Sequence, residues 1–263
     1  MVNYSTGKQF TSSGKRLLIT FCLDMSPSMG KKINHKHSAI SVLNQTVKGI
    51  TEELSKDKKL LNTVELMFVT FYSEVIDVTR TMLRQYQHTD FRNEPVGGSN
   101  IPLAVITSFN KIDERLEDYR RAGLRYHSPI FLLMSDGNPD YEESDATERR
   151  AMNLVSERCQ KSVSGSVCPF IIGIGDELDE GSRSTLRGYA NGFMDGYFHV
   201  MGDEQLQSKI AKMIVKLVSC SVQCTAQRGN YSAKTLDLTA CEMTQVQAMI
   251  NREIQKFRQE DRD

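Results

Sequence analysis

Three oxygen-bearing side chains alternate along the chain at Asp24, Ser26 and Ser28. Residues two apart in an extended loop point the same way, so this spacing directs one carboxylate and two hydroxyls to one side. Oxygen donors without histidine or cysteine suit hard cations such as Mg²⁺ or Mn²⁺ better than zinc or copper. The segment therefore predicts part of a divalent-metal site.

The residues before Asp24 indicate how this set is positioned. Residues 17–23 form a nearly continuous apolar run, which is typical of a strand covered on both faces of a parallel sheet. Sheets of this kind bind ligands beyond the carboxyl ends of their strands, where the strand order reverses. Asp24 follows such a strand and is expected at that edge.

Two later segments carry similar side chains. A glycine turn at Gly97 precedes the hydroxyl of Ser99, and an apolar strand at 129–134 precedes Asp136. This order resembles the metal-ion-dependent adhesion site of the von Willebrand factor type A (VWA) family, in which Asp-x-Ser-x-Ser is followed by a threonine-type hydroxyl and then by an aspartate. Ser99 stands where the family usually carries threonine, which keeps the oxygen and loses a methyl group.

The resemblance implies a complete set of metal ligands, namely Asp24, Ser26, Ser28, Ser99 and Asp136. It also implies that the hydroxyls bind the cation directly and that the aspartates bind directly or through water. A carboxylate of a protein partner then completes the octahedron. Two carboxylates only just neutralise a divalent cation, and neutral hydroxyls leave the ion electrophilic enough to bind an external Asp or Glu. The expected function is divalent-metal-dependent protein–protein interaction, with Mg²⁺ or Mn²⁺ as cofactor, rather than catalysis.

The resemblance covers nearly all of residues 15–218. Within the family, residues 123–137 with Pro139 and Asp140 are most similar to bacterial cytosolic members, among them those associated with tellurium resistance and stress responses. This similarity implies a role in a bacterial stress-response or multi-protein system.

Composition excludes several other classes of protein. Lys plus Arg and Asp plus Glu each number 33, which argues against a general binder of nucleic acid or of anionic membranes. The first 15 residues lack the apolar core of a signal peptide, and no later run approaches the ~18–20 apolar residues of a membrane span. We therefore expect a cytoplasmic protein. Cys220, Cys224 and Cys241 are too irregularly spaced to favour a zinc site.

The order of apolar patterns predicts an α/β fold with a doubly wound, mainly parallel, Rossmann-like sheet. Strands at 63–71 and 75–78, joined by a short turn, place one antiparallel strand at the sheet edge. The other predicted elements are helices at 33–54, 101–119, 144–160, 182–189 and 206–217 and strands at 168–175 and 196–200.

Three regions are expected along the chain. Residues 1–14 form a flexible N-terminal tail, residues 15–220 form the VWA domain, and residues 221–263 form a linker and an amphipathic C-terminal helix. Apolar residues from Val246 to Phe257 mark one face of that helix, which either docks on the domain or contacts a partner.

Two alternative functions remain at this stage. A divalent-metal-dependent hydrolase of phosphoesters would use the same ion to activate water, with Asp140 or Glu142 as the base. A metal-independent scaffold would instead act through the C-terminal helix. A phosphatase of the haloacid dehalogenase type is excluded, because it needs a carboxylate two residues after Asp24, where Ser26 stands.

Overall fold

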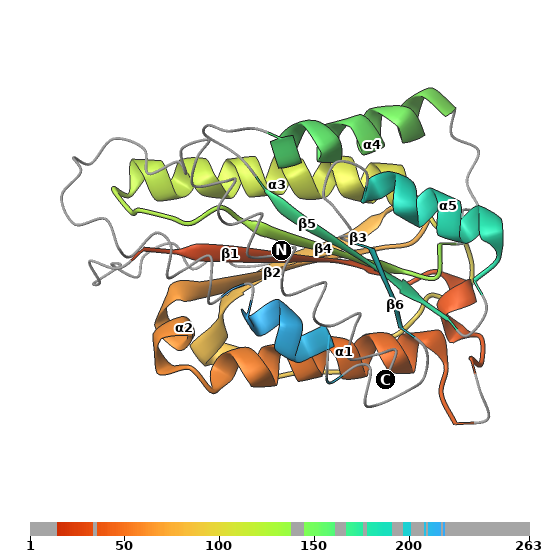
Figure 1. Cartoon of the computed structure of the whole chain (residues 1–263), viewed down its shortest axis with the longest axis horizontal. Helices are drawn as coiled ribbons and strands as arrows, with labels where there is room; N and C mark the ends of the chain where they lie inside the picture. Colours follow the sequence, from red (N-terminus) through yellow and green to blue (C-terminus); the bar gives the residue numbers. More distant parts are fainter. Residues whose placement is uncertain are drawn as a thin grey trace, which may run out of the picture.

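A six-stranded sheet separates two layers of helices in the described part of the chain (Figure 1). The computed structural model describes residues 15–33, 36–137, 145–160, 167–175, 178–190, 197–200, 208, 210–216 and 218. The strands are β1 (Leu17–Asp24), β2 (Val64–Phe71), β3 (Val75–Met82), β4 (Ile130–Ser135), β5 (Cys168–Ile174) and β6 (Tyr197–Val200). The helices are α1 (Ala39–Ser55), α2 (Lys58–Thr63), α3 (Ile101–Arg121), α4 (Asp145–Gln160) and α5 (Glu180–Tyr189), with short 3-10 turns η1 (Pro27–Gly30) and η2 (Leu83–Gln85).

The strand order is β3-β2-β1-β4-β5-β6. Strand β3 pairs antiparallel with β2, and the other neighbouring strands pair in parallel. This confirms the predicted α/β fold, mainly parallel with one antiparallel edge strand. The chain leaves β1 for β2 on one side and later returns to β4 on the other, so the order reverses at β1. The carboxyl ends of β1 and β4 therefore flank the point where such sheets bind ligands.

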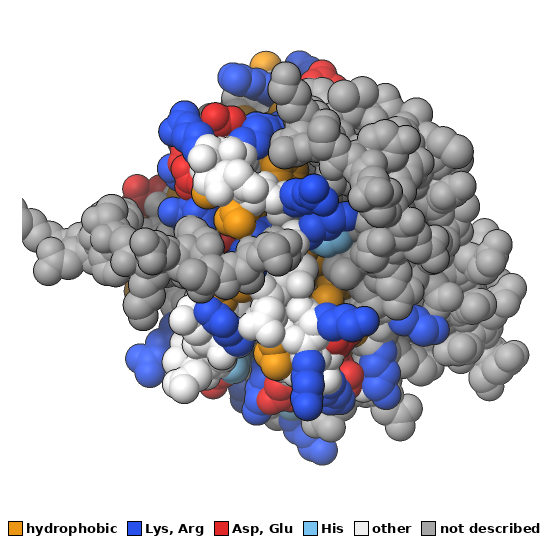
Figure 2. All heavy atoms as spheres, turned by 90° about the vertical axis from the view of Figure 1, so that its left-hand side faces the viewer, with side chains coloured by type: hydrophobic (Ala, Val, Ile, Leu, Met, Phe, Trp, Pro, Cys, Tyr) orange, Lys and Arg blue, Asp and Glu red, His pale blue; other side chains and the backbone are white. Residues whose placement is uncertain are grey.

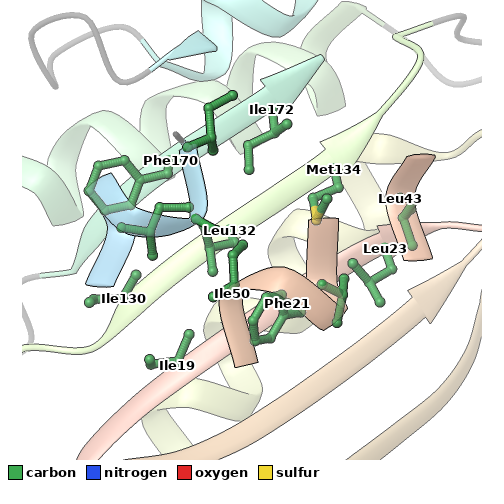
Figure 3. Close-up of a cluster of buried hydrophobic side chains, with 14 of the residues drawn as sticks. Ile19, Phe21, Leu23, Leu43, Ile50, Ile130, Leu132, Met134, Phe170 and Ile172 are labelled. Atoms are coloured by element: carbon green, nitrogen blue, oxygen red, sulfur yellow. The ribbon is translucent and has the colours of Figure 1, made fainter. Parts of the chain in front are cut away.

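Alternate residues of β1 pack into different helical layers. Helices α1 and α2 cover one face of the sheet, and α3, α4 and α5 cover the other (Figure 1). Ile19 and Phe21 lie in the apolar cluster under α1 (Figure 3), whereas Leu18 and Cys22 pack on the side of α3. Each large apolar side chain that is fully buried contributes about 1.5–3 kcal/mol. The strand is buried along its whole length and gives Asp24 a rigid base.

Helix α1 begins later than the sequence predicted. The prediction started it at residue 33, but Ser38 forms the N-cap, and its side chain accepts a hydrogen bond from the Ser41 backbone N–H at 3.3 Å. Lys32 and Ser38 pair in an isolated antiparallel β-bridge, so Lys32 lies beside the cap residue. A hydroxyl at the N-cap satisfies a backbone N–H that the first helical turn leaves without a partner. The helix therefore starts at Ala39.

Two smaller differences from the prediction concern strand β3 and helix α2. The prediction ended the edge strand at residue 78, whereas β3 continues to Met82 because it stays paired with β2 down to Glu65. It also omitted α2, which Asp57 caps by accepting a hydrogen bond from Lys59 N at 2.7 Å.

Several predicted segments lie outside the described residues. They are the N-terminal tail at 1–14, the linker and helix at 221–263 with the stripe from Val246 to Phe257, and the loop with Asp140 and Glu142. The predicted helix at 206–217 is described in part, and residues 208, 210–216 and 218 are helical. Ile210 and Ile214 pack into the cluster under α1. Within the described residues, no helix combines the length and the apolar character needed to cross a membrane.

Candidate metal centre

The Asp24 carboxylate lies at the centre of the candidate site. It is fully buried at the carboxyl end of β1. One carboxylate oxygen, Oδ1, accepts a hydrogen bond from Ser26 N at 2.8 Å. The other, Oδ2, accepts from Ser99 Oγ at 2.7 Å and from Ser135 Oγ at 2.6 Å. The carboxylate is therefore held in one orientation by groups from three segments that are far apart in the sequence.

The hydroxyls of Ser26 and Ser28 lie next to each other, with their oxygens 2.9 Å apart. The sequence predicted an extended loop here, but Pro27–Gly30 forms the 3-10 turn η1 instead. Proline fits the first turn of a helix, and this turn brings the two hydroxyls together. Ser26 precedes η1 without capping it through its side chain. Its hydroxyl thus has no local capping role and faces Ser28 instead.

Ser99 reaches Asp24 because its loop is tied to the hairpin between β2 and β3. On one side of it Gly98 N donates to Ser73 Oγ, and on the other Asn100 N donates to Tyr72 O, both at 2.7 Å. Gly97 has φ +104°, and a Cβ there would lie 2.6 Å from a ring carbon of Tyr72. The glycine turn seen in the sequence is therefore required by the close approach of this loop to the hairpin.

Asp136 follows β4 directly, next to the end of β1. The strands pair in parallel with Leu23 opposite Met134, so Ser135 comes beside Asp24 and Asp136 lies one residue beyond. Ser135 Oγ accepts a hydrogen bond from Gly137 N at 2.9 Å while it donates to Asp24. Asp136 is half-buried and lines a cavity together with Ser28. All the predicted ligand positions thus converge at one edge of the sheet.

The electrostatics of the site depend most on Asp24, which has no counter-charge among the described residues. Burial and, to a smaller extent, the negative charge of Asp136 together raise the pKa of Asp24 from 3.8 to about 6, against the hydrogen bonds of Ser135 and Ser26. In the described part of the chain, hydroxyls and one backbone amide donate to Asp24, and no Lys, Arg or His side chain pairs with it. A cation from outside the chain would relieve both effects.

The donor set fits a hard divalent cation. A hydroxyl that donates its proton to a carboxylate keeps its oxygen lone pairs, so the serines can bind a cation while they hold Asp24. Among the described residues, no group of three or more His, Cys, Asp and Glu side chains could hold a metal. The candidate site contains only two carboxylates, and three serine hydroxyls complete an all-oxygen donor set of the kind that Mg²⁺ and Mn²⁺ prefer.

Sequence reasoning missed the part that Ser135 plays. It is buried and contacts the same Asp24 oxygen as Ser99. Its place as the last residue of an apolar strand was the available signal, because it is a polar residue at the edge where Asp24 was expected. The anchoring of the Ser99 loop by Tyr72 and Ser73 was also missed, and it depends on contacts that no local pattern reveals.

Solved structures with a similar fold include pilus proteins. The PilB minor pilin from Streptococcus sanguinis superposes with a TM-score of 0.51 at 12% identity, over 78% of this chain and 61% of PilB. The pilus adhesin SpaC from Lactobacillus rhamnosus GG, in its open conformation, superposes with a TM-score of 0.56 at 12% identity, over 80% of this chain and 30% of SpaC. The chain thus spans less than two thirds of either protein.

No protein-family model and no curated protein sequence matches the chain. At this level of identity the structures show the fold, which is VWA-like. The neighbours named are a minor pilin and a pilus adhesin. They do not bear on the predicted association with tellurium resistance or stress responses.

Proposed function

We propose that the chain is a divalent-metal-dependent protein-binding module in which Asp24, Ser26, Ser28, Ser99 and Asp136 hold Mg²⁺ or Mn²⁺. The observation that carries the proposal is the buried Asp24 carboxylate, which three serine-containing segments hold beside Asp136 without a cation from the described chain. When bound, the cation supplies a positive charge that attracts a carboxylate of a protein partner. The VWA-like fold, shared with a pilus adhesin, supports an interaction role.

The chain's own residues have distinct parts in this proposal. Ser28 and Asp136 line the cavity and so present the cation to a partner. Asp24 is fully buried, so it lies on the side of the site away from the partner. There it orients the serines and balances part of the cation's charge. Asp24 and Asp136 only just neutralise a divalent cation and the hydroxyl ligands add no charge, so the cation stays electrophilic enough to form a charge-assisted contact with a partner carboxylate. The partner supplies that Asp or Glu, and we propose neither nucleic acid nor a membrane as a partner.

Catalysis is not part of the proposal. A phosphoester hydrolase would need a base beside the metal, and nothing in the sequence spacing singles one out. The candidates Asp140 and Glu142 lie outside the described residues. A location in the cytoplasm and a link to bacterial stress responses also belong to this proposal, on the strength of the sequence resemblance.

Calorimetric titration with Mg²⁺ and Mn²⁺ tests the site. The parent chain is expected to bind one equivalent, and Ser26→Ala combined with Ser28→Ala is expected to lose binding because two ligand oxygens are removed. Ser55→Ala is the matched control, since its hydroxyl donates to Thr51 O at 2.7 Å at the far end of α1. Binding that is equal in the parent and the double variant would refute the metal site.

Capture of partners from a native cell extract tests the interaction. Binding is expected with Mg²⁺ and is expected to be lost with chelator and in the double serine variant. A partner that is retained in all three conditions would show that binding uses another surface, such as the segment from Val246 to Phe257, and would support the scaffold alternative.

A further inference from the structure

A cavity of about 520 Å³ opens beside the candidate metal centre. Ser28 and Asp136 line it, so the proposed cation would face into it. The other walls come from the segment before α1 and from the segment between β5 and α5. Pockets that bind ligands typically measure ~300–1,000 Å³, so this cavity has room for more than a single carboxylate.

The two walls of the cavity differ in charge. Lys31 and Lys32 lie on the wall before α1, and Asp179 lies on the wall before α5. Both lysines are exposed, and within the described residues neither forms an ion pair. Asp179 is engaged in capping α5, where its carboxylate accepts hydrogen bonds from Ser182 N at 2.7 Å and from Ser182 Oγ at 3.2 Å. The lysine wall is thus the one that can receive an anion.

The backbone holds the lysine wall in a fixed relation to the candidate ligands. Lys31 N donates to Ser28 O at 2.9 Å, so Lys31 lies one turn after a proposed metal ligand. Ala39 N donates to Lys31 O at 3.1 Å, and Lys32 pairs with Ser38. The lysines are therefore tied both to the metal centre and to the start of α1.

We propose that this cavity selects partners with two nearby carboxylates on one acidic segment. One carboxylate binds the cation and the second pairs with Lys31 and Lys32. This inference rests on the proposed function and adds a specificity to it. The acidic Asp179 on the opposite wall disfavours the reverse orientation, because like charges repel, and so gives the bound segment a direction.

Short blocked peptides provide the test. One peptide has the sequence Gly-Asp-Ala-Asp-Gly and the second has Gly-Asp-Ala-Asn-Gly, each acetylated and amidated, so only the number of carboxylates differs. Affinities for the full chain with saturating Mg²⁺ are measured by NMR titration. The first peptide is expected to bind about fivefold more tightly, as suits one exposed ion-pair contact, and this advantage should shrink with added salt.

Lys31→Gln combined with Lys32→Gln is expected to bind the two peptides equally. Lys58→Gln with Lys59→Gln is the matched control, because this exposed pair lies on α2, at the end where the parallel strands begin. Figure 2 looks onto that end, where Lys and Arg side chains are spread over the described surface with Asp and Glu among them. The control should keep the fivefold preference.

The outcomes separate the two proposals. If the parent binds Mg²⁺ but binds neither peptide, or binds both equally, or if the Lys31 and Lys32 variant keeps the preference, the two-carboxylate inference is wrong. If the parent binds no divalent cation by calorimetry, the proposed function itself fails, and this inference fails with it.

Discussion

Two buried carboxylates of this protein, Glu65 and Asp24, lie on neighbouring strands and are treated in opposite ways. Glu65, near the start of β2, receives Arg115 at 2.9 Å and the Tyr119 hydroxyl at 2.5 Å. Asp24, at the end of β1, receives hydroxyls and a backbone amide and has Asp136 nearby. The chain supplies a cation for one carboxylate and, among the described residues, none for the other.

The contrast distinguishes a structural charge from one that is prepared for a ligand. An ion pair such as Glu65 with Arg115 is complete within the chain, and it joins β2 to α3. Burying a carboxylate among neutral donors beside a second carboxylate costs free energy in the absence of a cation. Binding an external cation offsets that cost, so Asp24 is expected to matter more for binding than for stability.

The largest effect is expected when the internal cation is removed. Arg115→Met leaves Glu65 buried with the Tyr119 hydroxyl but without a counter-charge, which should lower the free energy of unfolding by about 3 kcal/mol in urea denaturation. Arg121→Met on the same helix is the control, because Arg121 is exposed and its pair with Glu117 contributes less than about 1 kcal/mol. Mg²⁺ affinity should stay unchanged in both variants. Equal losses of stability in the two variants would contradict the view that Glu65 needs Arg115 as its counter-charge.

The corresponding change at the other carboxylate is Asp24→Asn. Without metal the variant should be at least as stable as the parent, because the change removes a buried charge that the described chain does not neutralise. At Mg²⁺ concentrations 100-fold above the dissociation constant the parent should gain about 2.7 kcal/mol, and the variant should gain nothing. Urea denaturation with and without Mg²⁺ measures both values. Asp77→Asn, on the exposed edge strand, should respond to Mg²⁺ like the parent.

Gly97→Ala tests whether the Ser99 loop must approach the hairpin closely. A Cβ at Gly97 would lie 2.6 Å from Tyr72 in a backbone conformation that alanine rarely adopts, so a loss of about 2 kcal/mol is expected together with weaker Mg²⁺ binding. Gly123→Ala has a similar backbone cost, with φ +67°, but no atom within 4 Å of its Cβ. It should lose about 1 kcal/mol and bind Mg²⁺ normally. Identical metal affinity in both variants would contradict the proposed role of the loop.

The sheet and the positions of the candidate ligands could be predicted from the sequence because both depend on local patterns of residues. The apolar run before Asp24 and the hairpin ending in β3 follow from periodicity and turn chemistry, and the structure bears them out. The start of α1 did not follow, because the cap at Ser38 overrode an apolar spacing that continued back to Ile33. The assignment of the ligands to a metal stays a prediction.

The contacts that join the segments of the site could not be predicted from local sequence patterns. Ser135 contacts Asp24 only because β4 returns beside β1 in a particular register, more than a hundred residues later. The Ser99 loop likewise depends on Tyr72 and Ser73, which the sequence places on a different element. Such contacts are properties of the folded arrangement, and a single sequence does not encode them in its spacing.

The smallest effect is expected at Ser135. A variant of this residue tests whether the hydrogen bonds to Asp24 serve metal binding or, like those to Glu65, only stability. Ser135→Ala removes one donor to Asp24 and the acceptor of Gly137 N, which should cost about 1 kcal/mol of stability without metal. Because the hydroxyl orients Asp24 from behind, Mg²⁺ affinity should fall about tenfold.

The matched control for this change is Ser108→Ala, an equally buried serine on α3. It should leave Mg²⁺ affinity unaltered in the same calorimetric titration. If Ser135→Ala also bound Mg²⁺ with the parent's affinity while it lost stability, its hydroxyl would serve the fold alone. Asp24 would then resemble Glu65, a carboxylate whose hydrogen bonds stabilise the domain and do not prepare it for a cation.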